Sequence, residues 1–193
     1  MTRVLVTCPP MLKNIARFLP VFEKHGVEPV IPPIVQTLTE NELLAIVPTV
    51  DGWIIGDDPA TAKVFAAGKA GRLRAAVKWG VGVDNVNFAD AKTLGIPVTN
   101  TPQMFGNEVA ELVVAYMIGL ARQTHYIDRQ IRNGNWTKPT GVSLHGKCAA
   151  IIGLGDIGTA TAKRLRAFGM KLHGYDPRAS LSTHELFIDE RLD

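Results

Sequence analysis

The sequence predicts an α/β protein in which helices alternate with the strands of parallel sheets. From residue 1 to 100, short apolar runs alternate with helical patterns, an order typical of a parallel sheet covered by helices. A second unit of strand, glycine-rich turn, helix and strand follows at 147–176. Hydrophobic residues make up 46% of the chain and charged residues 20%, a composition that can bury a core.

Residues 1–100 are predicted to form five strands that are joined by helices. We expect strands at 3–7, 27–31, 52–56, 75–79 and 96–99. We expect helices at 12–25, from the capping box Thr39–Glu42 through Val47, at 60–67, and from Asn87 to Gly95. Pro20 is expected to kink the first helix, and Cys8-Pro9-Pro10 is expected to form a loop.

The longest predicted helix spans residues 107–133. Asn107 is expected to be its N-cap, and Gly134 follows its end. Residues 109–121 are nearly continuously apolar, so this helix is expected to be buried all round or to pack against another chain. Ser182-Thr183-His184-Glu185 predicts the start of a last short helix.

The most informative motif is Gly153-Leu154-Gly155-Asp156-Ile157-Gly158. It follows the apolar run Ala149–Ile152, which predicts a buried parallel strand, and it opens a helix. Gly153 allows a sharp turn, Gly155 lets a pyrophosphate approach the backbone, and Gly158 lets the helix pack closely on the sheet. The amides of Asp156 and Ile157 then point at the phosphates, while the Asp156 side chain is expected to point away.

Asp176 stands at the carboxyl end of the next predicted strand. A carboxylate there can accept hydrogen bonds from both ribose hydroxyls of an adenosine, and it repels a 2′-phosphate. The pattern therefore favours NAD over NADP, although the nearby Arg178 weakens that preference. The alternative is a tight glycine turn in an ordinary βαβ unit that binds no nucleotide.

A second motif, Lys78-Trp79-Gly80-Val81-Gly82-Val83-Asp84-Asn85-Val86, follows the strand predicted at 75–79. Its glycines free the backbone, so the amides of Val81 and Gly82 can form a small anion-binding nest. Lys78 adds a positive charge, and the combination suits a carboxylate, or a carboxylate plus a phosphate. The alternative is a structural turn with a surface lysine.

Charge and cysteine content argue against several other classes. The net charge is +3, and the most basic stretch, 122–138, is interpreted as a solvated helix face rather than a nucleic-acid surface. No apolar stretch reaches the ~18 residues of a membrane span, and the N-terminus runs directly into a strand without a signal peptide.

Cys8 and Cys148 are predicted to be buried thiols of a reducing, cytoplasmic compartment. The five histidines lack metal-ligand spacing, so no metal is expected.

Taken together, the two motifs resemble the D-isomer-specific 2-hydroxyacid dehydrogenase family, in particular its phosphoglycerate-dehydrogenase-like branch. The matching stretches are Lys78–Val86, Gly95–Pro102, Asn107–Glu111, Gly119–Arg122, Gly146-Lys147, and Gly153–Gly158 with Tyr175-Asp176-Pro177. Residues 1–74 match only in their alternation of strands and helices. The resemblance implies a flavodoxin-like substrate domain over 1–100 and the first part of a Rossmann NAD-binding domain over 101–193, with the active site between them.

The resemblance also implies residue roles and partners. The substrate-binding residues would be Lys78, Val81, Gly82 and Asn100, with Lys78 where phosphoglycerate dehydrogenases usually carry an arginine. The residues that bind the cofactor NAD would be Val109, Gly153, Leu154, Gly155, Asp156, Ile157, Gly158, Asp176 and Pro177. The implied reaction interconverts a D-2-hydroxy acid, including acids similar to 3-phosphoglycerate, and its 2-oxo acid. The family's homodimers pair through the long helix, here 107–133.

The family's catalytic arginine, glutamate and histidine lie downstream of the ribose-binding acid, and no set of residues in this sequence matches them. The resemblance therefore assigns no catalytic residue to this sequence. It implies a truncated or split enzyme whose missing part is C-terminal. The alternative is an inactive NAD-binding module that regulates or pairs with a full-length relative. Since the strand 149–152 is central in the complete fold, we expect it to expose an unpaired apolar edge.

Overall fold

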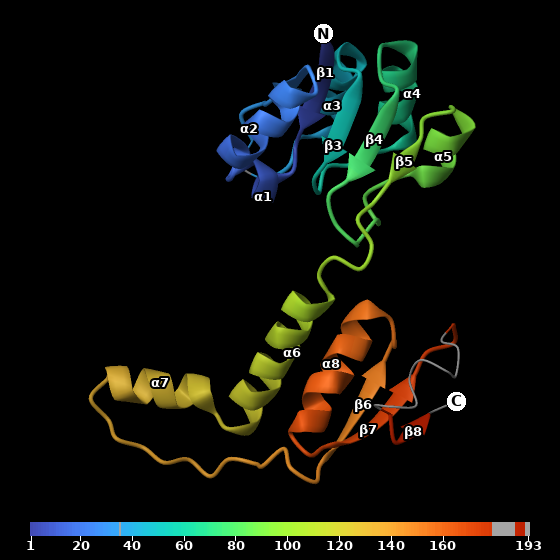
Figure 1. Ribbon diagram of the computed structural model, residues 1–193. Coiled ribbons are helices and arrows are strands. Elements are labelled where there is room, and N and C mark those ends of the chain that lie inside the picture. Colours follow the sequence, from blue (N-terminus) through green and yellow to red (C-terminus); the bar gives the residue numbers. More distant parts are fainter. Residues whose placement is uncertain (35, 179–187, 192–193) are drawn as a thin grey trace. The chain divides into compact units, whose positions relative to one another are not determined.

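A computed structural model describes residues 1–34, 36–178 and 188–191, and the chain divides into two compact units (Figure 1). Unit 1 spans Met1–Met104 and unit 2 spans Phe105–Asp193. Both are built from parallel strands and helices, which confirms the predicted α/β class. The last helix predicted after Ser182 lies outside the described residues.

Unit 1 contains a parallel sheet with the strand order β2-β1-β3-β4-β5. The strands are β1 (Thr2–Val6), β2 (Val27–Val30), β3 (Gly52–Ile55), β4 (Ala75–Lys78) and β5 (Val98–Thr99). Each lies within or next to a predicted range. Since β1 pairs with β2 on one side and with β3 on the other, the chain reverses its direction of winding at β1. In such open sheets, ligands bind beyond the carboxyl ends of the strands.

The helices of unit 1 follow their sequence signals closely, with one exception. They are α1 (Pro9–Leu12), α2 (Ile15–Lys24), α3 (Glu40–Ile46), the 3₁₀ helix η1 (Val47–Thr49), α4 (Ala62–Ala70) and α5 (Phe88–Thr93). The capping box at α3 forms as predicted: the N–H of Glu42 donates to Thr39 Oγ1, and the N–H of Thr39 donates to Glu42 Oε2. The exception is α1, which replaces the loop predicted at Cys8-Pro9-Pro10. Proline is tolerated in the first turn of a helix because the N–H that it lacks has no partner there.

Helices cover both faces of the unit 1 sheet. On one face, Leu5, Trp53 and Ile55 pack with apolar side chains of α3, α4 and α5. On the other face, Val6 and Ile54 pack with side chains of α1 and α2. Alternate residues of the same strand thus point into two cores, which is why Val4–Val6 of β1 and Trp53–Ile55 of β3 are all apolar.

Unit 2 contains a smaller parallel sheet, with the strand order β6-β7-β8 in the described residues. Its elements are α6 (Gly106–Ala121), α7 (Thr124–Arg132), β6 (Cys148–Ile152), α8 (Asp156–Ala167), β7 (Lys171–Tyr175) and β8 (Glu190–Arg191). α6 and α8 lie side by side and cover one face, where Leu165 and Leu172 form the centre of the core (Figure 1).

The single long helix predicted over 107–133 is wrong, because the chain forms two helices, α6 and α7. Gln123 adopts a left-handed conformation with φ of 55° between them, which ends α6 and redirects the chain. Asn107 is also not the N-cap, which is Phe105. The Asn107 side chain instead accepts a hydrogen bond from Arg164 of α8. Nor is α6 buried all round, since Leu112, Tyr116 and Leu120 are exposed.

β6 is parallel, as predicted, but it is not buried. It lies at the edge of the described sheet, and every second residue from Cys148 to Ile152 is exposed. Ile152 is 84% exposed. The expected unpaired apolar edge is therefore present in the described structure. The prediction that Cys148 is buried is wrong for the same reason, whereas Cys8 is buried against α1.

Candidate functional site

The glycine motif connects β6 to α8 by a sharp turn. Gly153 has a φ of +92°, a conformation that side chains rarely adopt, and its N–H donates to the carbonyl of Tyr175 at 2.7 Å. This bond continues the pairing of β6 with β7 up to the turn. The carboxyl ends of both strands are consequently held together at the point where the motif begins.

The other two glycines of the motif, Gly155 and Gly158, differ in the space beside them. A Cβ on Gly158 would overlap the carbonyl oxygen of Gly153, so any side chain there would push α8 away from the turn. A Cβ on Gly155 would meet no described atom within 4 Å other than those of its own chain neighbours. The space beside Gly155 is thus open to a ligand, while the space beside Gly158 is filled by the backbone, which is the arrangement that a bound pyrophosphate requires.

The N-terminus of α8 faces this open space. Gly155 is the N-cap and has no side chain that could cap the helix. The first N–H groups of a helix have no partner within the helix, so those of Asp156 and Ile157 are donors for an anion or for water. Thr159 stabilises the turn, since its hydroxyl donates to the carbonyl of Leu154 at 2.9 Å.

The carboxylate of Asp156 points toward α6. It packs against the backbone of Gly106, at the first residue of α6, where a Cβ would collide with it. The N-terminus of a helix is a favourable place for a negative charge. The Asp156 side chain therefore occupies another helix N-terminus, and its backbone N–H alone belongs to the phosphate-binding surface.

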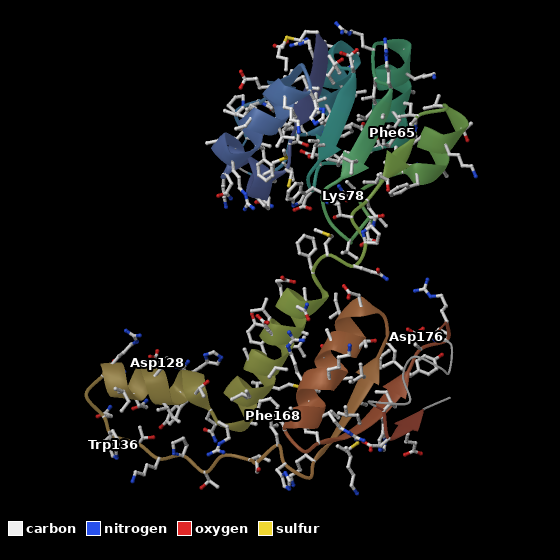
Figure 2. All side chains as sticks on the ribbon, in the orientation of Figure 1. Phe65, Lys78, Asp128, Trp136, Phe168 and Asp176 are labelled. Atoms are coloured by element: carbon white, nitrogen blue, oxygen red, sulfur yellow. The ribbon has the colours of Figure 1, made fainter. Side chains whose placement is uncertain are left out.

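Asp176 follows β7 (Figure 2), and its carboxylate accepts hydrogen bonds from two backbone N–H groups. The N–H of Leu154 donates to Oδ2 at 2.8 Å, and the N–H of Arg178 donates to Oδ1 at 2.9 Å. A carboxylate has about four acceptor positions, so these two bonds alone do not exhaust it. Leu154 thus binds the acid rather than the ligand. Exposed Pro177 starts the turn that brings the N–H of Arg178 back to the acid.

These residues fit a dinucleotide. The open space beside Gly155, the donors of α8 and the fixed acid lie in one unit, in the order that the pyrophosphate and the adenosine ribose require. Val109 is half-buried on the first turns of α6, the helix that packs against α8. Ile157 is partly exposed on the first turn of α8.

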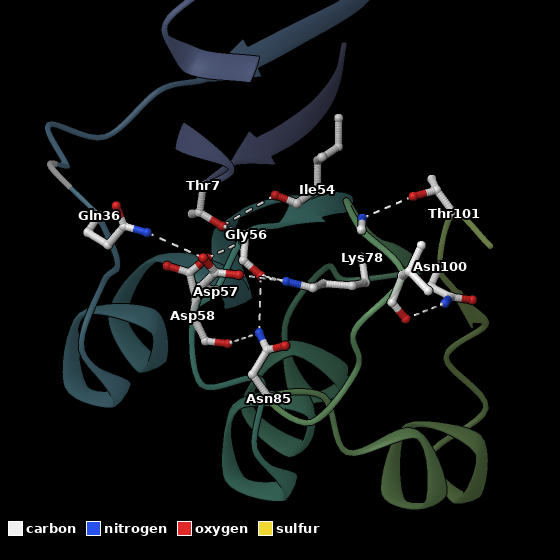
Figure 3. Close-up of polar contacts among 12 residues, drawn as sticks. Thr7, Gln36, Ile54, Gly56, Asp57, Asp58, Lys78, Asn85, Asn100 and Thr101 are labelled. Atoms are coloured by element: carbon white, nitrogen blue, oxygen red, sulfur yellow. Dashed lines mark hydrogen bonds and ion pairs between the residues drawn. The ribbon is translucent and has the colours of Figure 1, made fainter. Parts of the chain in front are cut away.

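In unit 1, the second motif lies beyond the carboxyl ends of β4 and β5 (Figure 3). The N–H of Gly80 donates to Thr101 Oγ1 at 3.0 Å, and Asn100 Nδ2 donates to the carbonyl of Val81 at 3.1 Å. These bonds hold the two loops together. Within the described residues, the N–H groups of Val81 and Gly82 donate to no protein acceptor, and both residues are exposed.

Lys78 lies at the end of β4 but does not present a free charge. Its side chain is buried, with 4% of the residue exposed. The ammonium donates to the carbonyl oxygen of Gly56 at 2.5 Å and to Asp57 Oδ1 at 3.0 Å (Figure 3). A buried ammonium requires such partners, because an unpaired charge in the interior is costly.

The sequence analysis did not identify the loop after β3 as part of this region. Asn85 Nδ2 donates to the carbonyls of Gly56 and Asp58, and it thereby connects this loop to the one after β4. Asp58 is fully buried and accepts from the N–H groups of Leu38 and Gly56. The signal was available, since Gly56 directly follows a strand whose carboxyl end must lie beside that of β4.

Other kinds of site were sought in the same structure. No group of three or more metal-ligating side chains gathers among residues 1–34, 36–178 and 188–191. Over those residues, none of the helices has the length and apolar character needed to cross a bilayer.

A glycine turn at a helix N-terminus, with an acid fixed at the end of the neighbouring strand, defines a dinucleotide-binding α/β protein. Comparison with known proteins agrees with this class. Residues 114–191 match the family model described as D-isomer specific 2-hydroxyacid dehydrogenase, NAD binding domain.

Individual relatives cover more of the chain. It is 38% identical over 143 residues to a hydroxypyruvate reductase of Thermotoga maritima, covering 72% of this chain and 46% of that protein. It is 36% identical over 164 residues to a D-3-phosphoglycerate dehydrogenase of Rattus norvegicus, covering 80% and 30% respectively. Among solved structures, the TT0316 protein from Thermus thermophilus superimposes with a TM-score of 0.84 at 28% identity, covering 100% of this chain and 60% of that one.

The chain matches the D-isomer-specific 2-hydroxyacid dehydrogenase family, and residues 114–191 correspond to the part that the family model describes as NAD-binding. It spans less than half the length of the two curated relatives described above.

Proposed function

We propose that the protein to which this chain belongs is an NAD-dependent oxidoreductase that interconverts a D-2-hydroxy acid and its 2-oxo acid. The observation that carries the proposal is the set of donors at the N-terminus of α8 beside the fixed carboxylate of Asp176. Unit 1 supports it with a second feature, the exposed N–H groups of Val81 and Gly82 beyond the end of β4.

Each part of the chain would have a separate task in this reaction. NAD, when bound, supplies an acceptor for the hydride that leaves the carbon bearing the hydroxyl group. The amides of Asp156 and Ile157 would hold its pyrophosphate, and Asp176 would hold the adenosine ribose. The amides of Val81 and Gly82 would bind the substrate carboxylate. Asn100 would keep that loop in place through its bond to the carbonyl of Val81.

Oxidation of the hydroxyl group also releases a proton, which a general base must accept. Within the described residues we assign this role to no side chain, because none of His25, His125, His145 and His173 belongs to the glycine turn 153–158 or to the loop 78–86. We place the proton-transfer group and a further residue that contacts the 2-oxo acid outside these 193 residues. Their position downstream of the ribose-binding acid is what the family resemblance implies.

A second candidate is an NAD-binding module without turnover that pairs with a full-length relative. The exposed edge of β6 supports it, because an apolar strand with one unpaired edge in the described sheet is a template for association with another chain. The exposed apolar stripe on α6, made of Leu112, Tyr116 and Leu120, supports association as well.

The experiment that separates the two candidates is an assay of the protein purified from its native source. NADH formation is followed with D- and L-enantiomers of small 2-hydroxy acids, and binding of NAD is measured on the same sample. Turnover of a D-enantiomer with NAD supports the enzyme. Binding of NAD without turnover of any acid supports the module, and absence of NAD binding contradicts both.

We further propose that two copies pair through the surface of α6. Residues 112, 116 and 120 recur every four positions, so they lie on one side of the helix. Sedimentation of the 193-residue chain should show a dimer, and Leu120→Lys should shift it toward the monomer. The free thiols of Cys8 and Cys148 support a cytoplasmic location.

A further inference from the structure

We propose that the loop after β3 restricts the substrate to small hydroxy acids without a phosphate group, and that Asp57 is the residue that sets this specificity. The inference rests on the proposed function, because it assumes that Val81 and Gly82 bind the substrate carboxylate. It concerns the end of the substrate that lies away from its carboxylate. That end would meet the charged side chains beyond the carboxyl ends of β3 and β4.

The first observation is that Lys78 is already neutralised. Among the described residues it is the one buried lysine or arginine, and its ammonium donates to Gly56 and to Asp57. To bind a phosphate, this ammonium would have to give up the carboxylate partner and become exposed. Both steps oppose binding, since a buried ion pair is stable only while its partners remain in place.

The second observation is the charge that remains. The side chain of Asp57 is 65% exposed, so its carboxylate contacts Lys78 on one side and faces solvent on the other. The following residue, Asp58, adds a second carboxyl group that is buried behind it. An incoming phosphate carries a charge of roughly −1.5 to −2 near neutral pH, and it would approach a negatively charged edge. An uncharged hydroxyl or methyl group meets no such repulsion.

The third observation is that the loop is held in place. Asn85 donates to the carbonyls on both sides of Asp57, those of Gly56 and Asp58. The Asp58 carboxyl accepts from the N–H groups of Leu38 and Gly56, and Gln36 Nε2 donates to Asp57 Oδ2 at 3.3 Å. A fixed carboxylate discriminates better than a mobile one, because it cannot turn away from an unfavourable ligand.

The test compares two acids that differ by one phosphate, D-glycerate and D-3-phosphoglycerate. Each is titrated into the 193-residue chain in the presence of NAD, and the amide chemical shifts of Val81 and Gly82 report binding. We expect D-glycerate to bind at least about tenfold more tightly. Tighter binding of the phosphorylated acid would overturn the inference.

Two variants identify the cause. Asp57→Asn removes the repelling charge and frees Lys78, so the preference for D-glycerate should fall by about tenfold. Asp84→Asn is the matched control, because it removes an exposed carboxylate from the loop after β4 that makes no contact with Lys78 in the described structure. Its preference should change much less, and an equal change in both variants would contradict the role of Asp57.

The proposed function can fail independently in the same experiment. If neither acid shifts the amides of Val81 and Gly82 while NAD still binds, the carboxylate site is wrong, and the inference falls with it. If D-glycerate binds there but the phosphorylated acid binds as well or better, the carboxylate site stands and the specificity inference alone is wrong.

Discussion

The last residues of two parallel strands show how differently the two units are completed. Ile55 ends β3 and is 0% exposed, whereas Ile152 ends β6 and is 84% exposed. β3 lies between β1 and β4 and has helices on both faces, while in the described residues β6 is an edge strand with helices on one face. The same residue type in the same kind of strand is thus buried or exposed according to its neighbours.

This contrast shows that strand formation and burial have different causes. A short apolar run specifies a parallel strand in both units, because strand formation depends on the run and on the turns at its ends. Burial depends on how many strands and helices surround it. In unit 1, strands and helices surround β3, whereas in the described part of unit 2 one side of β6 is open.

The largest expected effect tests the closed core of unit 1. Trp53→Ala empties a fully buried position beside Phe65, so the free energy of unfolding of unit 1 should fall by about 3–5 kcal/mol. Trp136→Ala is the control, because Trp136 is exposed in unit 2, and its effect should stay within about 0.5 kcal/mol (Figure 2). Urea unfolding followed by circular dichroism measures both, and equal effects would contradict the assigned core.

The next effect tests unit 2 through its glycines. Gly158→Ala should destabilise unit 2 by about 1–3 kcal/mol and abolish NAD binding, since the new Cβ overlaps the carbonyl of Gly153. Gly155→Ala should leave the stability nearly unchanged and still weaken NAD binding, because its Cβ enters only open space. Thermal unfolding and calorimetric NAD titration separate the two variants. Unchanged NAD affinity of Gly155→Ala would show that the open space is not the phosphate site.

A smaller effect is expected at acid pH, where carboxylates whose pKa is lowered by folding lose their charge, among them Asp51 in unit 1 and Asp189 in unit 2. The N–H of Arg3 and the guanidinium of Arg72 hold the pKa of Asp51 below its ordinary value in unit 1. The guanidinium of Arg166 and the N–H of Leu172 do the same for the pKa of Asp189 in unit 2.

Because both pKa values are lowered by folding, this stabilisation is present above the unfolded pKa of about 3.9 and is lost as the pH falls through the folded values. Urea unfolding between about pH 5 and about pH 2 should therefore show both units weakening. Asp51→Asn should flatten the dependence in unit 1 alone, and Asp189→Asn in unit 2 alone. A change in the other unit would argue that the two units unfold together.

The smallest expected effect tests the capping box of α3, which depends on residues close together in the sequence. Thr39→Ala removes the side-chain acceptor of the α3 capping box, so unit 1 should lose about 1 kcal/mol. Thr93→Ala is the control, because the Thr93 hydroxyl donates only to a carbonyl one turn earlier in α5. Urea unfolding of the two variants compares them directly. A loss as large for Thr93→Ala would contradict the capping role.

The sequence was sufficient to predict elements that depend on near neighbours. The five strands of unit 1, the capping box at Thr39 and the turn from β6 into α8 all follow from residues that lie close together in the chain. The fixed position of Asp176 was also predictable, because a strand of known direction leads to it.

The remaining features depend on contacts between distant residues. The break at Gln123 divides a continuous helical pattern, and no glycine or proline marks it. The burial of Lys78 depends on Gly56 and Asp57, more than twenty positions earlier in the sequence. Asp156 turns toward Gly106 because α6 packs against α8, and the spacing within the motif carries no information about that packing.

The central claim is that unit 2 binds NAD through the N-terminus of α8 and the acid after β7. It is tested most directly by titrating the 193-residue chain with NAD while amide chemical shifts are recorded. We expect the largest shifts at Leu154–Gly158 and Asp176, and a loss of affinity in Asp176→Ala. Absence of shifts at these residues, or equal affinity of Asp176→Ala, would contradict the account.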